Sequence, residues 1–239
     1  MATLLSALET QARYHLKETT ASYWSSAELV AHMNRGIKDL FRSVADLGQE
    51  HFLTEDVTNV SLSASATSLS GVPSDVYKIH LIEHADTTTT PGSRILFEPK
   101  DYNSFEFINA RAQTARDLNS GGVVYYALHG AGAPVAAPTV KIGPKLSSAI
   151  TATNIRFVYI PVLADKIVSE NNPIPGESDQ AVIAYTVAFA RAKEREDRSP
   201  DPNWLAIYKT EKDALLTSLT PRQVQKPEVV EDLFGVWVQ

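Results

Sequence analysis

The chain has 239 residues and no cysteine, which excludes disulfides, thiolate metal sites and cysteine nucleophiles. Its 28 acidic and 22 basic residues leave a formal net charge of −6, without a cluster of Lys or Arg. Tight binding of a nucleic-acid backbone needs concentrated positive charge, so the composition argues against a protein that grips duplex DNA. The longest apolar stretch is too short to span a bilayer, and the N-terminus lacks the features of a signal peptide. We therefore expect a soluble protein without membrane association.

Two helices are expected at the N-terminal end. Apolar residues recur every four positions within residues 2–18 and predict the first helix. A second helix is predicted at about 26–47, where Ser25 and Glu28 form a capping box ahead of a continuous apolar stripe. Gly48 follows as the residue that ends this helix.

The middle of the chain has the pattern of a β-rich region. Short runs with apolar residues at every second position, separated by Ser, Thr, Gly and Pro, are typical of strands. In the last of these runs, Ile155, Phe157 and Tyr159 are expected to share one face of a strand. A helical pattern interrupts the strands at 99–118. Its residues at helical spacing are Tyr102, Phe105, Ile108, Ala112 and Ala115.

His80 and His84 have the spacing that would place two metal ligands on one face of a helix. They fall in a strand pattern, however, where residues four apart lie roughly 13 Å from each other. Both therefore cannot bind one ion, and we predict no metal site and no cofactor.

The sequence offers no recognisable reaction centre. It lacks the G-x-S-x-G turn of hydrolases and the G-x-x-x-x-G-K-[ST] phosphate loop, and no Lys, Ser or Thr directly follows the glycine-rich run at 130–134. Glu194, Glu196 and Asp197 belong to an alternating run of charges. Such a run is typical of a solvated helix end, with ion pairs across a subunit boundary as the alternative. We predict no catalytic residue and no enzymatic activity.

Two further helices are expected near the C-terminal end. Residues 177–196 carry an apolar stripe so wide that this helix should be buried on more than one side. Asp201 and Pro202 have the character of an N-cap and a first helical residue, and they open the last helix. Pro221 ends it.

Apolar residues without helical spacing crowd the segment after Pro221. Full burial of each stabilises by roughly 1.5–3 kcal/mol, whereas ordering the backbone costs about 1–2 kcal/mol per residue. The segment can either pack on its own subunit or add to a neighbouring subunit or larger partner by strand addition or pocket insertion. The predicted partner-binding residues are Val229, Val230, Leu233, Phe234, Val236 and Trp237.

Residues 12–41 resemble the start of the head–tail adaptor proteins of tailed bacteriophages, which form a ring beneath the portal. In both, a first helix leads through a short turn with an aromatic residue and Ser or Thr into a capped helix. The matching residues are Tyr23, Trp24, Ser25, Glu28, Leu29, Met33 and Asn34. A later stretch is also similar, with a strand that ends at Ile160-Pro161 and a loop that contains Ile174-Pro175 ahead of a helix.

The resemblance implies an α+β fold, in which helices from both ends form a bundle and a β-rich domain with one internal helix is inserted between them. The expected boundaries are 1–50 and 173–220 for the bundle, 51–172 for the inserted domain and 221–239 for an extended C-terminal docking arm. The arm would contact the portal or a neighbouring subunit.

The function that the resemblance implies is structural. The protein would be made in the bacterial host cytoplasm and located in the neck of the virion, as a commonly dodecameric ring that joins the portal to a downstream tail protein. DNA would pass through its channel without specific binding, and a net negative wall suits that role. The alternatives are another tail or neck component, or an adhesin that binds through the β domain, and finally an enzyme.

Overall fold

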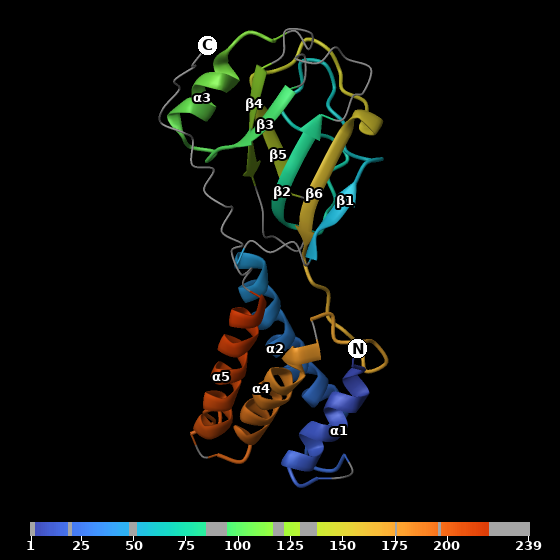
Figure 1. Cartoon of the computed structure of the whole chain (residues 1–239), viewed down its shortest axis with the longest axis vertical. Coiled ribbons are helices and arrows are strands. Elements are labelled where there is room, and N and C mark those ends of the chain that lie inside the picture. The colour runs from blue at the N-terminus through green and yellow to red at the C-terminus, as the bar shows by residue number, and fades with distance from the viewer. Residues whose placement is uncertain are drawn as a thin grey trace, which may run out of the picture. The chain divides into compact units, whose positions relative to one another are not determined.

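In the computed structural model (Figure 1) the protein is described at residues 3–18, 21–47, 52–84, 95–116, 122–129, 138–174, 176–195 and 197–219. Within these ranges the fold is α+β, with five α-helices and a six-stranded mixed sheet. The chain divides into two compact units. The first, here called the helical unit, comprises Met1–Gln49 and Asp165–Gln239, and the second, the β unit, comprises Glu50–Ala164.

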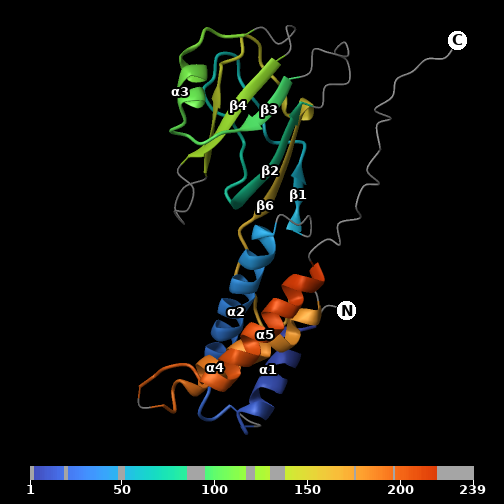
Figure 2. The same ribbon diagram turned by 60° about the vertical axis from the view of Figure 1, so that its left-hand side comes forward.

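The helical unit contains four helices, two from each side of the β unit in the sequence. They are α1 (Leu5–His15), α2 (Ser26–Asp46), α4 (Asp179–Arg191) and α5 (Pro202–Leu219). Helix α4 contacts all three others (Figure 2). Its wide apolar stripe is accordingly buried on several sides, as the sequence predicted, at Ala181, Val182, Ile183, Ala184, Val187, Ala188 and Ala190.

Local capping signals set the starts of two of these helices. Helix α2 begins after Ser25, whose Oγ accepts a hydrogen bond from the backbone N of Glu28 at 3.2 Å. Helix α5 begins at Pro202, and Oδ1 of Asp201 accepts from the backbone N of Asn203 at 2.9 Å. Both predicted helix starts are confirmed, whereas Gly48 and Pro221 lie outside the described residues.

The boundary after the β unit lies earlier than the sequence suggested. Residues 165–172 belong to the helical unit, because they hydrogen-bond to α2 and to the start of the chain. Asn34 on α2 donates from Nδ2 to the carbonyl of Lys166 at 2.9 Å and accepts from its backbone N at 2.8 Å. The backbone N of Asn172 donates to the carbonyl of Thr3 at 2.8 Å.

The β unit is built on one sheet with the strand order β1-β6-β2-β3-β4-β5. Strands β3 and β4 run parallel and are joined through α3, while all other neighbours are antiparallel. The elements are β1 (Thr54–Asp56), β2 (Val76–His84), β3 (Ile95–Pro99), α3 (Phe105–Ala112), β4 (Gly122–His129), β5 (Thr139–Gly143) and β6 (Ile155–Pro161).

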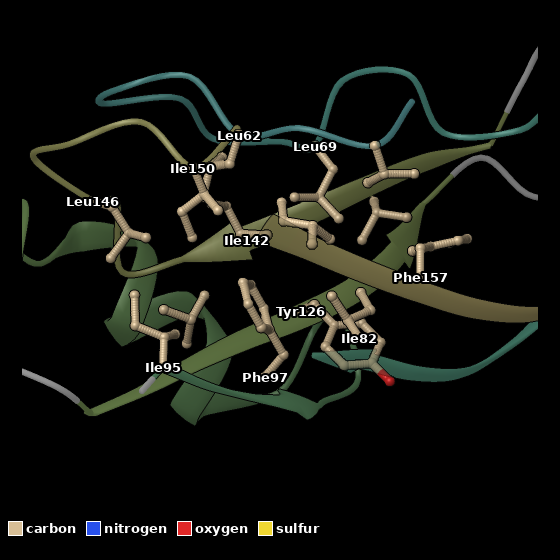
Figure 3. Packing of buried hydrophobic residues seen from close by; sticks show 14 of the residues in the cluster. Leu62, Leu69, Ile82, Ile95, Phe97, Tyr126, Ile142, Leu146, Ile150 and Phe157 are labelled. Carbon is tan, nitrogen blue, oxygen red and sulfur yellow. The ribbon is translucent and has the colours of Figure 1, made fainter. Parts of the chain in front are cut away.

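The apolar core of this unit lies on one face of the sheet (Figure 3). Ile155, Phe157 and Tyr159 of β6 all belong to it, so the predicted common face is confirmed. The segment that contains Leu62 and Leu69 adds further core side chains and also covers the edge of β5. Backbone bonds of 3.0 Å join Leu69 to Val140 and Ile142 to Thr67, which removes an edge that would otherwise be open to other chains.

Helix α3 is shorter than the pattern at 99–118 suggested. Ser104 caps it by accepting from the backbone N of Phe107 at 3.3 Å, and it ends at Ala112. The chain is then extended, since Arg116 exchanges backbone hydrogen bonds with residues 145–147. Residues 117 and 118 lie outside the described ranges.

Candidate interaction surfaces

The turn between α1 and α2 is organised around a buried guanidinium. The side chain of Arg13 donates to Oε1 of Glu9 at 2.8 and 2.9 Å, to Oε2 of Glu18 at 3.3 Å and to the carbonyl of Trp24 at 3.0 Å. Arg13 is only 7% exposed and Glu9 8%. Because its donors meet several acceptors, the buried charge is balanced and fixes the direction of the turn.

The carboxylate of Glu18 accepts hydrogen bonds from backbone amides of the same turn. Its oxygens accept from the backbone N of Tyr23, from that of Ser22 at 2.9 Å and from that of Trp24 at 3.2 Å. These bonds, above all the one from Tyr23, lower the pKa of Glu18 to about 2. The carboxylate therefore stays ionised as a partner of Arg13 at any physiological pH.

The aromatic pair that follows Glu18 connects this turn to α4. Trp24 is buried, and its Nε1 donates to the carbonyl of Ala190 at 2.9 Å. Nζ of Lys193 donates to the carbonyl of Tyr23 at 2.8 Å and lies 4.7 Å from the centre of its ring. Oε2 of Glu28 accepts from the same Nζ at 3.1 Å. The residues that carry the resemblance thus form a joint between helices from opposite ends of the sequence.

A second polar joint connects α2 with α5. The hydroxyl of Tyr208 and Nζ of Lys212 both donate to Oδ2 of Asp39, the latter at 2.7 Å. Burial, together with the hydrogen bond to this carboxylate, raises the pKa of Tyr208, so the phenol remains a donor. The ring of Tyr185 on α4 packs edge-on against that of Tyr208, at 5.1 Å between centroids.

The face of the sheet opposite the core carries an ion-pair row over three strands. Nε of Arg156 on β6 lies 2.8 Å from Oε1 of Glu55 on β1, and its Nη1 lies 3.4 Å from Oε2 of Glu83 on β2. Leu96 of β3, the register partner of Glu83, is 62% exposed, and Leu81 is 38% exposed. This face therefore combines apolar side chains with two carboxylates that share one cation.

Helix α3 contacts β4 and β5 on this same side of the sheet. Gly143 pairs with Tyr125, and the strand alternation directs both away from the core residue Ile142. A side chain at Gly143 would bring its Cβ within 2.8 Å of the backbone N of Arg111, so glycine permits the close approach of α3. The inner face of the helix buries Phe107 fully.

The outer face of α3 is also apolar, which sequence spacing did not distinguish from the inner face. Phe105 is 77% exposed and Ile108 is 52% exposed, and Ala112 follows at the same helical spacing. The periodicity that predicted this helix therefore marks its solvent side, whereas the residue buried most deeply, Phe107, lies off that pattern.

His80 and His84, the pair that was weighed as metal ligands, differ in their surroundings on β2. His84 is buried at the end of β2 and His80 is exposed on the same strand. No group of three or more His, Asp or Glu that could hold a metal ion occurs among the described residues. His51 lies outside them.

The charged run after α4 is exposed in the part that the structure describes. Oδ2 of Asp197 accepts from Oγ of Ser199 at 2.7 Å, and Nε of Arg195 lies 3.3 Å from Oδ1 of Asp197. The Ser199 hydroxyl, its backbone amide and Arg195 lower the pKa of Asp197. These contacts are local to the turn and fit a solvated helix end. Glu196 lies outside the described residues.

The six residues predicted to bind a partner cannot be placed on these surfaces. Val229, Val230, Leu233, Phe234, Val236 and Trp237 all lie outside the described residues. They remain a prediction from the sequence, and the described part of the chain ends with α5 at Leu219.

Comparison with known proteins does not identify the chain. No protein-family model matches it, and no curated protein matches it either. None of the helices described by the structure is long and apolar enough to cross a membrane.

Proposed function

We propose that the protein is a structural virion component, a ring-forming head–tail adaptor that links the portal to the tail and continues the DNA channel. One observation carries the proposal. Helices from both ends of the sequence form a single compact unit, and the β unit occupies the intervening residues Glu50–Ala164. This is the organisation that the resemblance to adaptor proteins implies.

The joint at the α1–α2 turn adds support, because it gives the resembling residues a physical role. Arg13, Glu18 and Trp24 hold the two N-terminal helices against α4 through buried polar contacts. A subunit that keeps its shape while it contacts two neighbours in a closed ring needs such fixed helix joints, since one patch must meet a different patch on the next copy.

Charge also fits the proposal. The formal net charge of −6 disfavours phosphate contacts, so DNA would slide along the wall of a channel instead of binding to it. In this proposal the partners are further copies of the chain, the portal and the next tail protein, and the location is the neck of the virion.

A second candidate is a tail component or adhesin that binds through the β unit. The exposed apolar side chains of Leu96 and Phe105 favour it, because large exposed apolar groups often mark contact sites. Unlike an adaptor, such a protein has no requirement for a ring or for binding to the portal.

Electron microscopy of the purified full chain, alone and mixed with portal-containing heads that lack tails, tests the proposal. We expect closed rings or collars at the portal vertex, and co-sedimentation with these heads but not with heads that lack the portal. Particles that stay monomeric and never bind the portal vertex would contradict the adaptor function. Binding to the cell surface or to tail tips would favour the second candidate.

A further inference from the structure

We propose that the outer face of α1 packs against the outer face of α5 in a neighbouring copy of this chain. The inference deepens the proposed function and rests on it, since a ring requires copies to associate. On α1, Tyr14 is 76% exposed, and Leu4, directly before the helix, is 45% exposed. Glu9 and Arg13 of the same helix are both buried. The outer face of α1 therefore contains no Asp, Glu, Lys or Arg. It consists of Leu4, Ala7, Thr10, Gln11 and Tyr14.

Helix α5 has a second exposed face without charge. Ile207 on this face is 43% exposed. The charged side chains of Lys209 and Asp213 are also exposed, but they lie beyond one edge of the face. The outer face of α5 consists of Asn203, Ile207, Thr210, Ala214 and Thr217.

The spacing on both helices is that of a seam between two helices. Along α1, residues 4, 7, 11 and 14 follow one another at intervals of three, four and three. Along α5, residues 203, 207, 210, 214 and 217 follow the same alternation. Such narrow stripes are typical of helices that pack on a partner helix. The outer side of α2 differs, since Arg35, Arg42 and Asp46 are exposed there, as expected for a helix face in water.

The threonines of both faces satisfy their hydroxyl donors within their own helices. Oγ1 of Thr10, Thr210 and Thr217 each donates to the carbonyl oxygen four residues earlier, at 2.9, 3.1 and 2.8 Å. Contact with another helix would therefore leave none of these three donors without an acceptor. The two faces are thus suited to burial, although neither is covered within the chain.

The two faces also match each other in size. Large side chains stand at both ends of the α1 face, at Leu4 and Tyr14, whereas Thr210 and Ala214 leave the α5 face shallow. At 1.5 Å per residue the faces extend over about 15 and about 21 Å. The exposed face of α3 fits α1 less well, because that helix has only eight residues and presents the bulky side chains of Phe105 and Ile108.

The position of the faces favours a second copy as the partner. Helices α1 and α5 both contact α4 and lie on its two sides (Figure 1). One copy can therefore offer α1 to one neighbour and α5 to the next. A contact between two different patches of the same chain is what a closed ring requires.

Exchange of charges across the contact tests the inference in the full-length chain. Gln11→Lys or Thr210→Glu alone buries an unpaired charge, so each should raise the concentration at which half of the chain is assembled at least about tenfold. The chain that carries both substitutions should return to within about threefold of wild type, because each new charge meets its opposite on the next copy. Sedimentation velocity measures assembly. Ala31→Lys on the outer side of α2 is the control and should have no effect. All variants should melt within about 2 °C of wild type, since the substituted positions are exposed.

Each contrary result is decisive. Unchanged assembly of either single variant, or no recovery in the double variant, would overturn the inference. So would assembly of Thr210→Glu alone together with assembly of a mixture of Gln11→Lys and Gln11→Glu chains, because α1 would then pair with α1. Rings that tolerate both single substitutions would refute this contact and leave the adaptor function intact. Charge-dependent assembly without binding to portal-containing heads would support the contact and refute the adaptor function.

Discussion

The helical unit buries charged side chains where its helices meet, whereas the β unit keeps its ion pairs on an exposed face of the sheet. The guanidinium of Arg13 has a side-chain exposure of 8%, compared with 43% for that of Arg156. Both units have a buried apolar core, but in the helical unit buried polar contacts also join the helices. We therefore expect the buried ion pairs of Arg13 to contribute far more to the free energy of unfolding than the exposed ion pairs of Arg156.

The largest effect is expected when the buried cation is removed. Arg13→Met leaves the carboxylates of Glu9 and Glu18 in the α1–α2 turn without their cation, which should cost about 3–5 kcal/mol of unfolding free energy. Urea unfolding followed by tryptophan fluorescence measures this loss, because Trp24 and Trp204 both belong to the helical unit.

Arg13→Lys is the matched control, since it keeps the charge but not the fork of donors, and we expect an intermediate loss. A loss below about 1 kcal/mol for Arg13→Met would show that the turn does not depend on its buried ion pair.

A smaller effect is expected at the start of α2. Ser25→Ala with Glu28→Ala removes the cap of the helix and the link from Glu28 to Lys193. The expected cost is about 1–2 kcal/mol, because a capping hydrogen bond of this kind contributes roughly that much. Thermal melts of the double variant and of Ser25→Ala alone measure both parts. An unchanged midpoint in the double variant would mean that the helix does not rely on its cap.

The exposed ion pairs of the sheet should matter least among the charged contacts. Arg156→Met should lower the melting midpoint only slightly at low salt, and the difference from wild type should vanish near 1 M salt, where the Debye length is about 3 Å. Hydrogen exchange at amides of β1 and β6 would localise any change. If Arg156→Met destabilises the protein as strongly as Arg13→Met, the contrast between the two units does not hold.

The features that could be predicted from the sequence are local. The start of α2 depends on residues 25 and 28, and that of α5 on Asp201 and Pro202, so each signal lies within one helical turn. The burial of α4 on several sides follows from the width of its own apolar stripe. The common face of Ile155 and Phe157 follows from strand alternation.

The features that the sequence missed depend on distant pairs. The β unit ends before residue 165 because Asn34 binds Lys166, a contact between residues 132 apart. Helix α3 ends early because residue 116 pairs with the chain near residue 146. The outer stripe of α3 could not be distinguished from an inner one by periodicity alone, because the buried face is the one that packs against the distant strand residue Gly143. Val229 to Trp237 remain a prediction.

The smallest effect is a pH dependence at the contact between α2 and α4. His32 stacks on the ring of Phe189, at 6.2 Å between centroids, and its Nδ1 is buried without a hydrogen-bond partner among the described residues. Burial, helped by the nearby charge of Arg35 and opposed by that of Glu28, lowers the pKa of His32 below the ordinary 6.5. Below pH 6.5 the unfolded chain therefore binds more protons than the folded one, so stability should fall as the pH drops from about 6.5 towards the lowered pKa and level off beneath it. Melting midpoints of wild type and His32→Gln between pH 8 and 5 test this, and we expect the wild-type curve to be the steeper of the two below pH 6.5. Parallel curves would show that other groups cause the pH dependence of the melting midpoint and that the titration of His32 does not contribute to it.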